Sequence, residues 1–208
     1  MINKVVSTLD SLFINPHCEL NYSKDYELLI SVMLSAQTTD VRVNSVTRVL
    51  YKKYDTLEKL ANADRKDIID IIRPIGTFSR KSKNIIEISR RLIKDCDGKV
   101  INDRKYLESL PGVGRKTVNV VLSNLYDENV IAVDTHVDRV AKRLKLAKKN
   151  DDVLEVEKKL TRKFKDFKLG RIHHQLVLFG RYYCKAKNPK CKDCNLKDIC
   201  DFYKKANR

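Results

Sequence analysis

A short glycine-containing segment, residues 110–122 (LPGVGRKTVNVVL), has residue types that could bind phosphate and act as a nucleophile. Pro111 ends the preceding helix, and Gly112 and Gly114 permit a tight turn before the next helix begins. The N–H groups of such a turn and the positive end of the following helix dipole together form a site for a phosphate oxygen. A plain connection between two helices is the alternative interpretation.

Lys116 lies at the start of the second helix, on the side opposite its apolar stripe. A cation in the first helical turn opposes the helix dipole, so local energetics do not explain its presence. Its amine could act as a nucleophile if a partner base accepted a proton. A solvated surface lysine is the other interpretation. The stripe consists of Val118, Val121, Leu122 and Leu125.

Four of the six cysteines are grouped near the C-terminus, in a polar segment that contains several lysines. Thiolates this close together in an irregular segment require a metal to organise them. Zinc is the most common ion in four-cysteine sites, although the spacing lacks the paired modules of zinc ribbons. An iron–sulfur cluster also takes four cysteines. The four are Cys184, Cys191, Cys194 and Cys200.

The composition favours a polyanionic partner. The chain of 208 residues has 43 lysines and arginines against 27 acidic residues, a net charge of +16. A positive field concentrates phosphate-bearing partners, so nucleic acid is the first candidate and an anionic membrane surface the second. No segment has the pattern of a signal peptide or the length of a membrane span. We therefore expect a cytoplasmic protein, associated with the nucleoid if it is bacterial.

The apolar pattern predicts an all-α fold, because apolar residues recur at spacings of three and four and no segment alternates as a strand would. Helices are expected near residues 29–34, 46–50, 68–72, 85–93, 105–110, 135–144, 153–164 and 172–183. Helix N-caps are expected at Ser23, Asp40, Asp64, Asp103 and Asp134. With 4 prolines and 6 glycines, the connections should be short.

Three motifs occur together: the glycine turn with its lysine, the segment VDTHVDRV at residues 133–140, and a C-x6-C-x2-C-x5-C pattern. Their combination resembles the endonuclease III family of DNA glycosylases and abasic-site lyases over nearly the whole chain. The resemblance implies that Lys116 is the nucleophile, that Asp134 assists it and that the cysteines hold a [4Fe-4S] cluster. It further implies base excision repair: removal of oxidised pyrimidines from duplex DNA, then strand cleavage by β-elimination. An N-cap role for Asp134 is compatible with this.

The same resemblance implies contacts with DNA from three regions. The helix-hairpin-helix motif would contribute Gly112, Val113, Gly114, Arg115 and Thr117, and the cysteine segment would contribute Lys185, Lys187, Lys190 and Lys192. Gln37 would enter the gap that is left when the damaged base leaves the stack. Thr77 stands where the family commonly has a second inserted residue, a leucine, so this chain departs from the family there.

The resemblance also implies a monomer with two domains: a six-helix domain at residues 18–128, and an iron–sulfur cluster domain at residues 1–17 and 129–208. The substrate groove would lie between them, with Lys116 on one side and Asp134 on the other. Two alternatives remain at this stage. One is a monofunctional glycosylase for mispaired adenine, although such relatives usually lack a lysine at this position. The other is a metal-stabilised DNA-binding module without catalysis.

Overall fold

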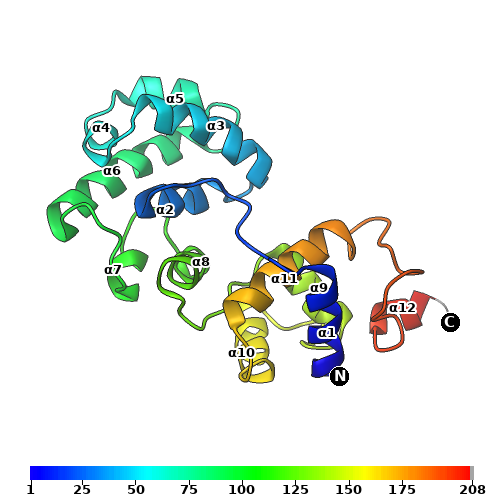
Figure 1. Ribbon diagram of the computed structural model, residues 1–208. Helices are drawn as coiled ribbons and strands as arrows, with labels where there is room; N and C mark the ends of the chain where they lie inside the picture. The colour runs from blue at the N-terminus through cyan, green and yellow to red at the C-terminus, as the bar shows by residue number, and fades with distance from the viewer. Residues whose placement is uncertain (207–208) are drawn as a thin grey trace. The chain divides into compact units, whose positions relative to one another are not determined.

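The computed structural model describes residues 1–206 and divides the chain into two compact units (Figure 1). Cys18–Tyr126 forms what we call the hairpin unit, and Met1–His17 with Asp127–Arg208 forms the cysteine unit. Every regular element in the described part of the chain is an α-helix, which confirms the all-α prediction. No helix among these residues is both long and apolar enough to cross a membrane.

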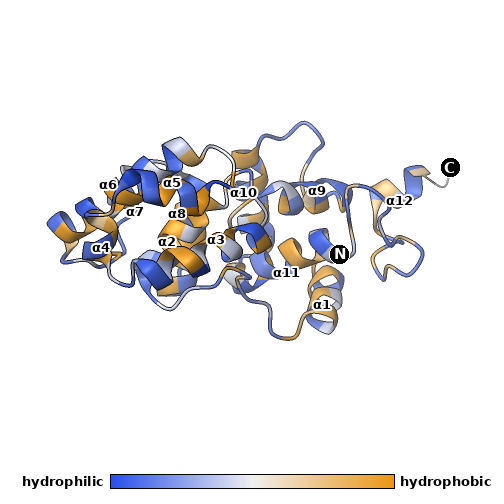
Figure 2. Cartoon of the chain, turned by 90° about the horizontal axis from the view of Figure 1, so that it is seen from above, coloured by the Kyte–Doolittle hydropathy of each residue, from blue (hydrophilic) through white to orange (hydrophobic). Residues whose placement is uncertain are grey.

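The hairpin unit is built around a helix that is buried on all sides. Residues 26–34 of α2 are all buried, and α3, α6 and α8 pack against this helix. Figure 2 shows α2 mainly in the hydrophobic colour, as expected of a helix inside a core. The helices of the unit are α2 (Asp25–Leu34), α3 (Asp40–Lys53), α4 (Leu57–Ala61), α5 (Arg65–Ile72), α6 (Phe78–Cys96), α7 (Arg104–Glu108) and α8 (Arg115–Tyr126).

These are seven helices, one more than the six expected. The additional helix is α4, which, like α7, has only five residues. Five residues make little more than one helical turn, so α4 cannot show a repeating apolar pattern. Its Leu57, Leu60 and Ala61 are nevertheless buried, and α4 packs against α6.

The cysteine unit is organised around α11, which packs against α1 and α9. The carboxylate of Asp10 in α1 accepts hydrogen bonds from Arg171 and Gln175 in α11, at 2.8 Å each, and so joins the N-terminal helix to the rest of the unit. Phe164 and Phe179 are among the largest buried side chains of its core. The helices are α1 (Ile2–Leu12), α9 (Thr135–Arg143), α10 (Val153–Lys163), α11 (Leu169–Tyr182) and α12 (Asp201–Ala206).

Three of the five predicted N-caps are confirmed: the side chains of Asp64, Asp103 and Asp134 each accept a hydrogen bond from a backbone N–H of the first helical turn. The predictions for Asp40 and Ser23 are wrong by one residue. The N-cap of α3 is Thr39, the residue before Asp40, and its side-chain oxygen accepts a hydrogen bond from the Arg42 N–H. The N-cap of α2 is Lys24.

Candidate functional site

The glycine-containing segment forms a tight turn between two helices. Helix α7 ends at Glu108, two residues before the predicted end at Leu110, and α8 begins at Arg115. The Val113 N–H donates to the Leu110 carbonyl at 3.1 Å, and the Val113 side chain is buried. Val113 therefore supports the turn from within.

Two glycines of this turn have different structural requirements. Gly112 has φ +77°, and a Cβ atom there would overlap Nδ2 of Asn84 and lie 3.4 Å from Cγ of Met33. A Cβ atom on Gly114 would meet no atom within 4 Å. Gly112 is thus required by the turn and its packing, whereas Gly114 leaves the outer surface of the turn open.

Lys116 is exposed in the first turn of α8, as its position opposite the apolar stripe predicts. Val118, Val121 and Leu122 of that stripe are fully buried, and Leu125 is half-buried. Within the part of the chain that the structure describes, no hydrogen bond or ion pair of the Lys116 amine is found. The Lys116 side chain therefore extends into solvent beside the glycine turn, where one ligand could contact the amine and the turn together.

Asp134 is the N-cap of α9, in the cysteine unit. Its Oδ1 accepts a hydrogen bond from the Val137 N–H at 2.7 Å, and the residue is half-buried. Two neighbouring residues of α9 have partners of their own. Asp138 pairs with Lys142 at 2.8 Å, and His136 packs against Gly180, where a Cβ atom would lie 2.8 Å from the His136 Cβ.

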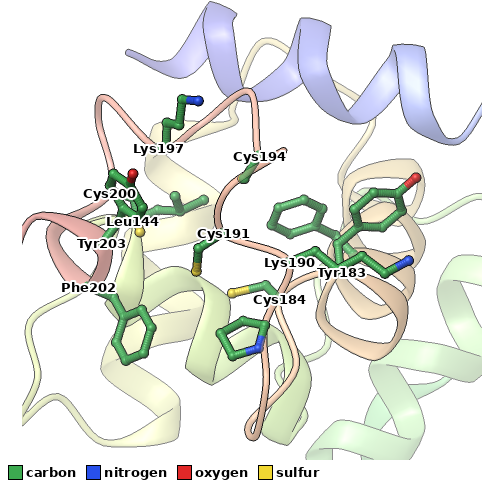
Figure 3. A pocket seen from close by; sticks show the side chains of 12 residues that line it. Leu144, Tyr183, Cys184, Lys190, Cys191, Cys194, Lys197, Cys200, Phe202 and Tyr203 are labelled. Carbon is green, nitrogen blue, oxygen red and sulfur yellow. The ribbon is translucent and has the colours of Figure 1, made fainter. Parts of the chain in front are cut away.

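The four C-terminal cysteines line one cavity, together with aromatic and aliphatic side chains (Figure 3). The sulfur atoms of Cys184 and Cys191 point toward each other in Figure 3, and none of the four forms a disulfide. Burial raises the pKa of the Cys191 and Cys194 thiols, and the neighbouring sulfurs raise it further. Among residues 1–206, no three histidine, cysteine or acidic side chains are placed to hold a metal ion. The set of four thiols around a cavity is compatible with a metal cluster.

Arg143, which the sequence analysis did not single out, holds the cysteine segment against α9. Its guanidinium donates to Sγ of Cys184 at 3.3 Å and to the carbonyl of Lys185 at 2.7 Å. Its central carbon lies 3.9 Å from the ring centroid of Phe202 in α12. Arg143 therefore joins α9, the start of the cysteine segment and the helix that follows it.

The predicted DNA contacts outside the hairpin lie on exposed surface. The four lysines of the cysteine segment, Lys185, Lys187, Lys190 and Lys192, are exposed, and the Lys190 amine lies 4.9 Å from the ring centroid of Tyr183. Gln37 and Thr77, both in the hairpin unit, are also exposed. Each has a positive φ, 58° for Gln37 and 56° for Thr77, which is uncommon for residues other than glycine.

Comparison with known proteins places these features in one family. Residues 30–166 match the family model described as HhH-GPD superfamily base excision DNA repair protein. The endonuclease III of Bacillus subtilis strain 168 is 45% identical over 192 residues, which cover 92% of this chain and 88% of that protein.

Two solved structures agree over the whole chain. A non-covalent complex of endonuclease III with DNA has a TM-score of 0.95 and 42% identity, and it covers 100% of this chain and 97% of the other. A trapped covalent intermediate of endonuclease III and DNA, an estranged-adenine complex, has a TM-score of 0.93 and 42% identity, covering 100% and 99%. This chain therefore belongs to the endonuclease III family, within the HhH-GPD superfamily of base excision DNA repair proteins.

Proposed function

We propose that this protein is a DNA glycosylase and abasic-site lyase that removes oxidised pyrimidines from duplex DNA, with Lys116 as its nucleophile. The observation that carries the proposal is the exposed Lys116 amine, two residues after a glycine turn that is suited to binding phosphate. Such a turn would hold the DNA backbone while the amine reaches the adjacent sugar. The net charge of +16 supports binding to a polyanion.

The chemistry requires an amine. A lysine that has lost a proton to a base attacks C1′ of the damaged nucleotide, and the glycosidic bond breaks with its electron pair leaving on the base. The sugar ring then opens to an imine of the lysine. Loss of a proton from C2′ expels the 3′ phosphate by β-elimination, and water hydrolyses the imine to return the lysine. A hydroxyl nucleophile could not form this imine.

We assign the proton-accepting role to Asp134. Its Oδ1 is engaged by the Val137 N–H, which fixes the orientation of the carboxylate, while the second oxygen remains for a proton or a developing positive charge. Lys116 belongs to the hairpin unit and Asp134 to the cysteine unit. The proposal therefore requires both units to meet the same nucleotide.

The DNA contacts follow from exposure and charge. Gly112, Gly114 and Arg115 lie on the outer surface of the turn, and Thr117 is half-buried beside them. The exposed lysines of the cysteine segment would contact phosphates further along the duplex. Gln37 would occupy the space that the extruded base leaves in the stack.

The cofactor proposed for the four cysteines is a [4Fe-4S] cluster. The four thiols line one cavity, and the resemblance of their spacing to endonuclease III favours a cluster over the single zinc ion that four cysteines can also hold. Four thiolate ligands also suit a cluster of several iron atoms. Bound there, it would make the lysine-bearing segment rigid, while Arg143 supports the segment from the protein side.

Reductive trapping tests the proposal. The metal-replete protein is incubated with duplex DNA that carries oxidised thymine or an abasic site, and borohydride is added to convert the imine into a stable covalent adduct. We expect the adduct with the wild type and none with Lys116→Ala. Lys105→Ala is the matched control, because Lys105 is also exposed and lies in α7, just before the turn.

Two results would contradict the proposal. An adduct that persists in Lys116→Ala would assign the nucleophile to another amine. No adduct with a preparation that binds DNA would refute the lyase assignment, and Lys116 would then be a contact to the DNA backbone. Salt-dependent binding is common to these interpretations and does not distinguish them.

A further inference from the structure

Lys81 in α6 is a lysine inside the core of the hairpin unit. Its side chain is only 3% exposed, and it lies on the same helical face as Ile85 and Ile88, which are fully buried. Burial lowers the pKa of Lys81, and the nearby Arg80 lowers it further. Burying an ammonium group is unfavourable unless it is hydrogen-bonded, so the contact that it makes must be important for the local structure.

That contact lies in the turn between α2 and α3. The Lys81 amine donates to the carbonyl oxygen of Ala36 at 2.9 Å. The carbonyl of Ala36 belongs to the same peptide plane as the nitrogen of Gln37. Holding this oxygen therefore limits rotation of the plane, and with it the φ angle of Gln37.

Gln37 needs such a restraint. Its φ of 58° is in the left-handed region, which the Cβ atom of an L-residue disfavours. Within the turn itself, the Thr38 N–H donates to the Ser35 carbonyl at 3.0 Å. A left-handed residue other than glycine persists only where its surroundings impose the conformation, and such residues often occur at functional sites.

The backbone of Lys81 is connected to another exposed residue with a left-handed conformation, Thr77. The carbonyl of Thr77, the N-cap of α6, accepts from the N–H groups of Arg80 at 3.1 Å and Lys81 at 3.0 Å. The main chain of Lys81 is thus attached to the turn of Thr77, and its amine to the turn of Gln37. One buried side chain joins two exposed turns that are 40 residues apart in the sequence.

We propose that Lys81 is a positioning residue, which holds Gln37 in the conformation needed to enter the DNA stack when the damaged base is extruded. This inference rests on the proposed function of the protein. A simpler role would be a cap on the last carbonyls of α2, which a lysine can provide. The two differ in what they predict, because a cap affects stability alone, whereas a positioning residue affects the step in which a base leaves the duplex.

The test compares two activities of Lys81→Met, which keeps an apolar side chain of similar length and loses the amine. Single-turnover excision of oxidised thymine from duplex DNA requires extrusion, whereas β-elimination at an abasic site in single-stranded DNA does not. We expect excision to fall at least about tenfold and the single-strand reaction to stay within about twofold. Lys83→Met is the matched control: Lys83 is exposed on the same helix, and both activities should be retained.

A double-mutant cycle shows whether Lys81 acts through Gln37. If it does, Lys81→Met should reduce excision far less in a Gln37→Ala protein than in the wild type, because the residue it positions is already absent. If Lys81→Met fails to fold, Lys81→Gln, which keeps a donor, enters the same cycle. We expect Lys81→Gln to retain more excision activity than any folded variant whose residue 81 has no hydrogen-bond donor.

Three outcomes would overturn the inference. Excision could remain unchanged in Lys81→Met, it could fall equally with and without Gln37, or it could fall together with the single-strand reaction and the melting temperature. A failure of the proposed function is recognised separately, because the wild type would then excise no base and form no borohydride adduct.

Discussion

Replacing Gly112 by alanine should destabilise the hairpin turn by an amount that the structure allows us to estimate. Because φ at position 112 is +77°, an alanine there would have to adopt the left-handed conformation, which costs about 1–2 kcal/mol of conformational free energy. Its Cβ would also overlap Nδ2 of Asn84, and moving that side chain away from its rotamer costs about 0.5–1.5 kcal/mol. We therefore expect the free energy of unfolding to fall by about 1.5–3.5 kcal/mol.

Urea unfolding followed by circular dichroism measures this change. Gly114→Ala is the control, because its Cβ would meet no atom within 4 Å and its φ is not positive; we expect a change within about 0.5–1 kcal/mol. Combining Gly112→Ala with Asn84→Ala removes the overlapping atoms and should recover about 1 kcal/mol relative to additivity. Equal stability of the two glycine variants, or strict additivity in the double variant, would refute this explanation of the turn.

Three further perturbations address other parts of the molecule. Asp134→Asn keeps an N-cap oxygen but not the charge, so excision should fall on the order of 100-fold while the melting temperature stays unchanged. Asp134→Ala should lose the same activity and also about 1 kcal/mol of stability. Equal excision by the wild type and Asp134→Asn would exclude Asp134 as the base. Arg143→Met should lower the visible absorbance of bound metal per protein. Arg143→Lys should have the same effect, because a lysine lacks the planar guanidinium that donates to several acceptors at once. Full metal content in Arg143→Met would show that Arg143 is not needed for metal binding. Burial lowers the pKa of His174 from 6.5 to about 3, so the unfolded chain takes up a proton that the folded chain resists, and stability falls as the pH drops through this window. The melting temperature of His174→Gln should therefore vary less with pH than that of the wild type. If melting temperature changes with pH in the same way in both proteins, His174 is not the source of the pH dependence.

Helical periodicity and N-cap preferences predicted those structural features that depend only on residues close together in the sequence. Helical periodicity placed Lys116 on the exposed side of α8, because the apolar stripe that it opposes continues over about two turns. Aspartates before apolar segments predicted the caps of α5, α7 and α9. The rule failed at Asp40 because Thr39, one residue earlier, can provide the same oxygen.

Lys81 and Arg143 were missed for different reasons. Lys81 had a local signal, since its spacing from Ile85 and Ile88 is four and seven residues and places a lysine on an apolar face. Arg143 had none: a basic residue in the last turn of a helix is ordinary. Its hydrogen-bond partners Cys184 and Lys185 lie more than 40 residues later in the chain. Only the fold brings them together.

Asp134 shows that a structural role and a chemical role need not be alternatives. A carboxylate has two oxygens, and the cap uses Oδ1 alone, at 2.7 Å from the Val137 N–H. That bond restricts the side-chain torsions, so the direction of the second oxygen is set before any substrate binds. An uncapped aspartate on a loop would have to be ordered during the reaction, which costs conformational entropy. The N-cap at α9 is therefore best understood as the means by which the fold positions the proposed base, and the same bond explains why asparagine, which preserves the cap, separates the two roles.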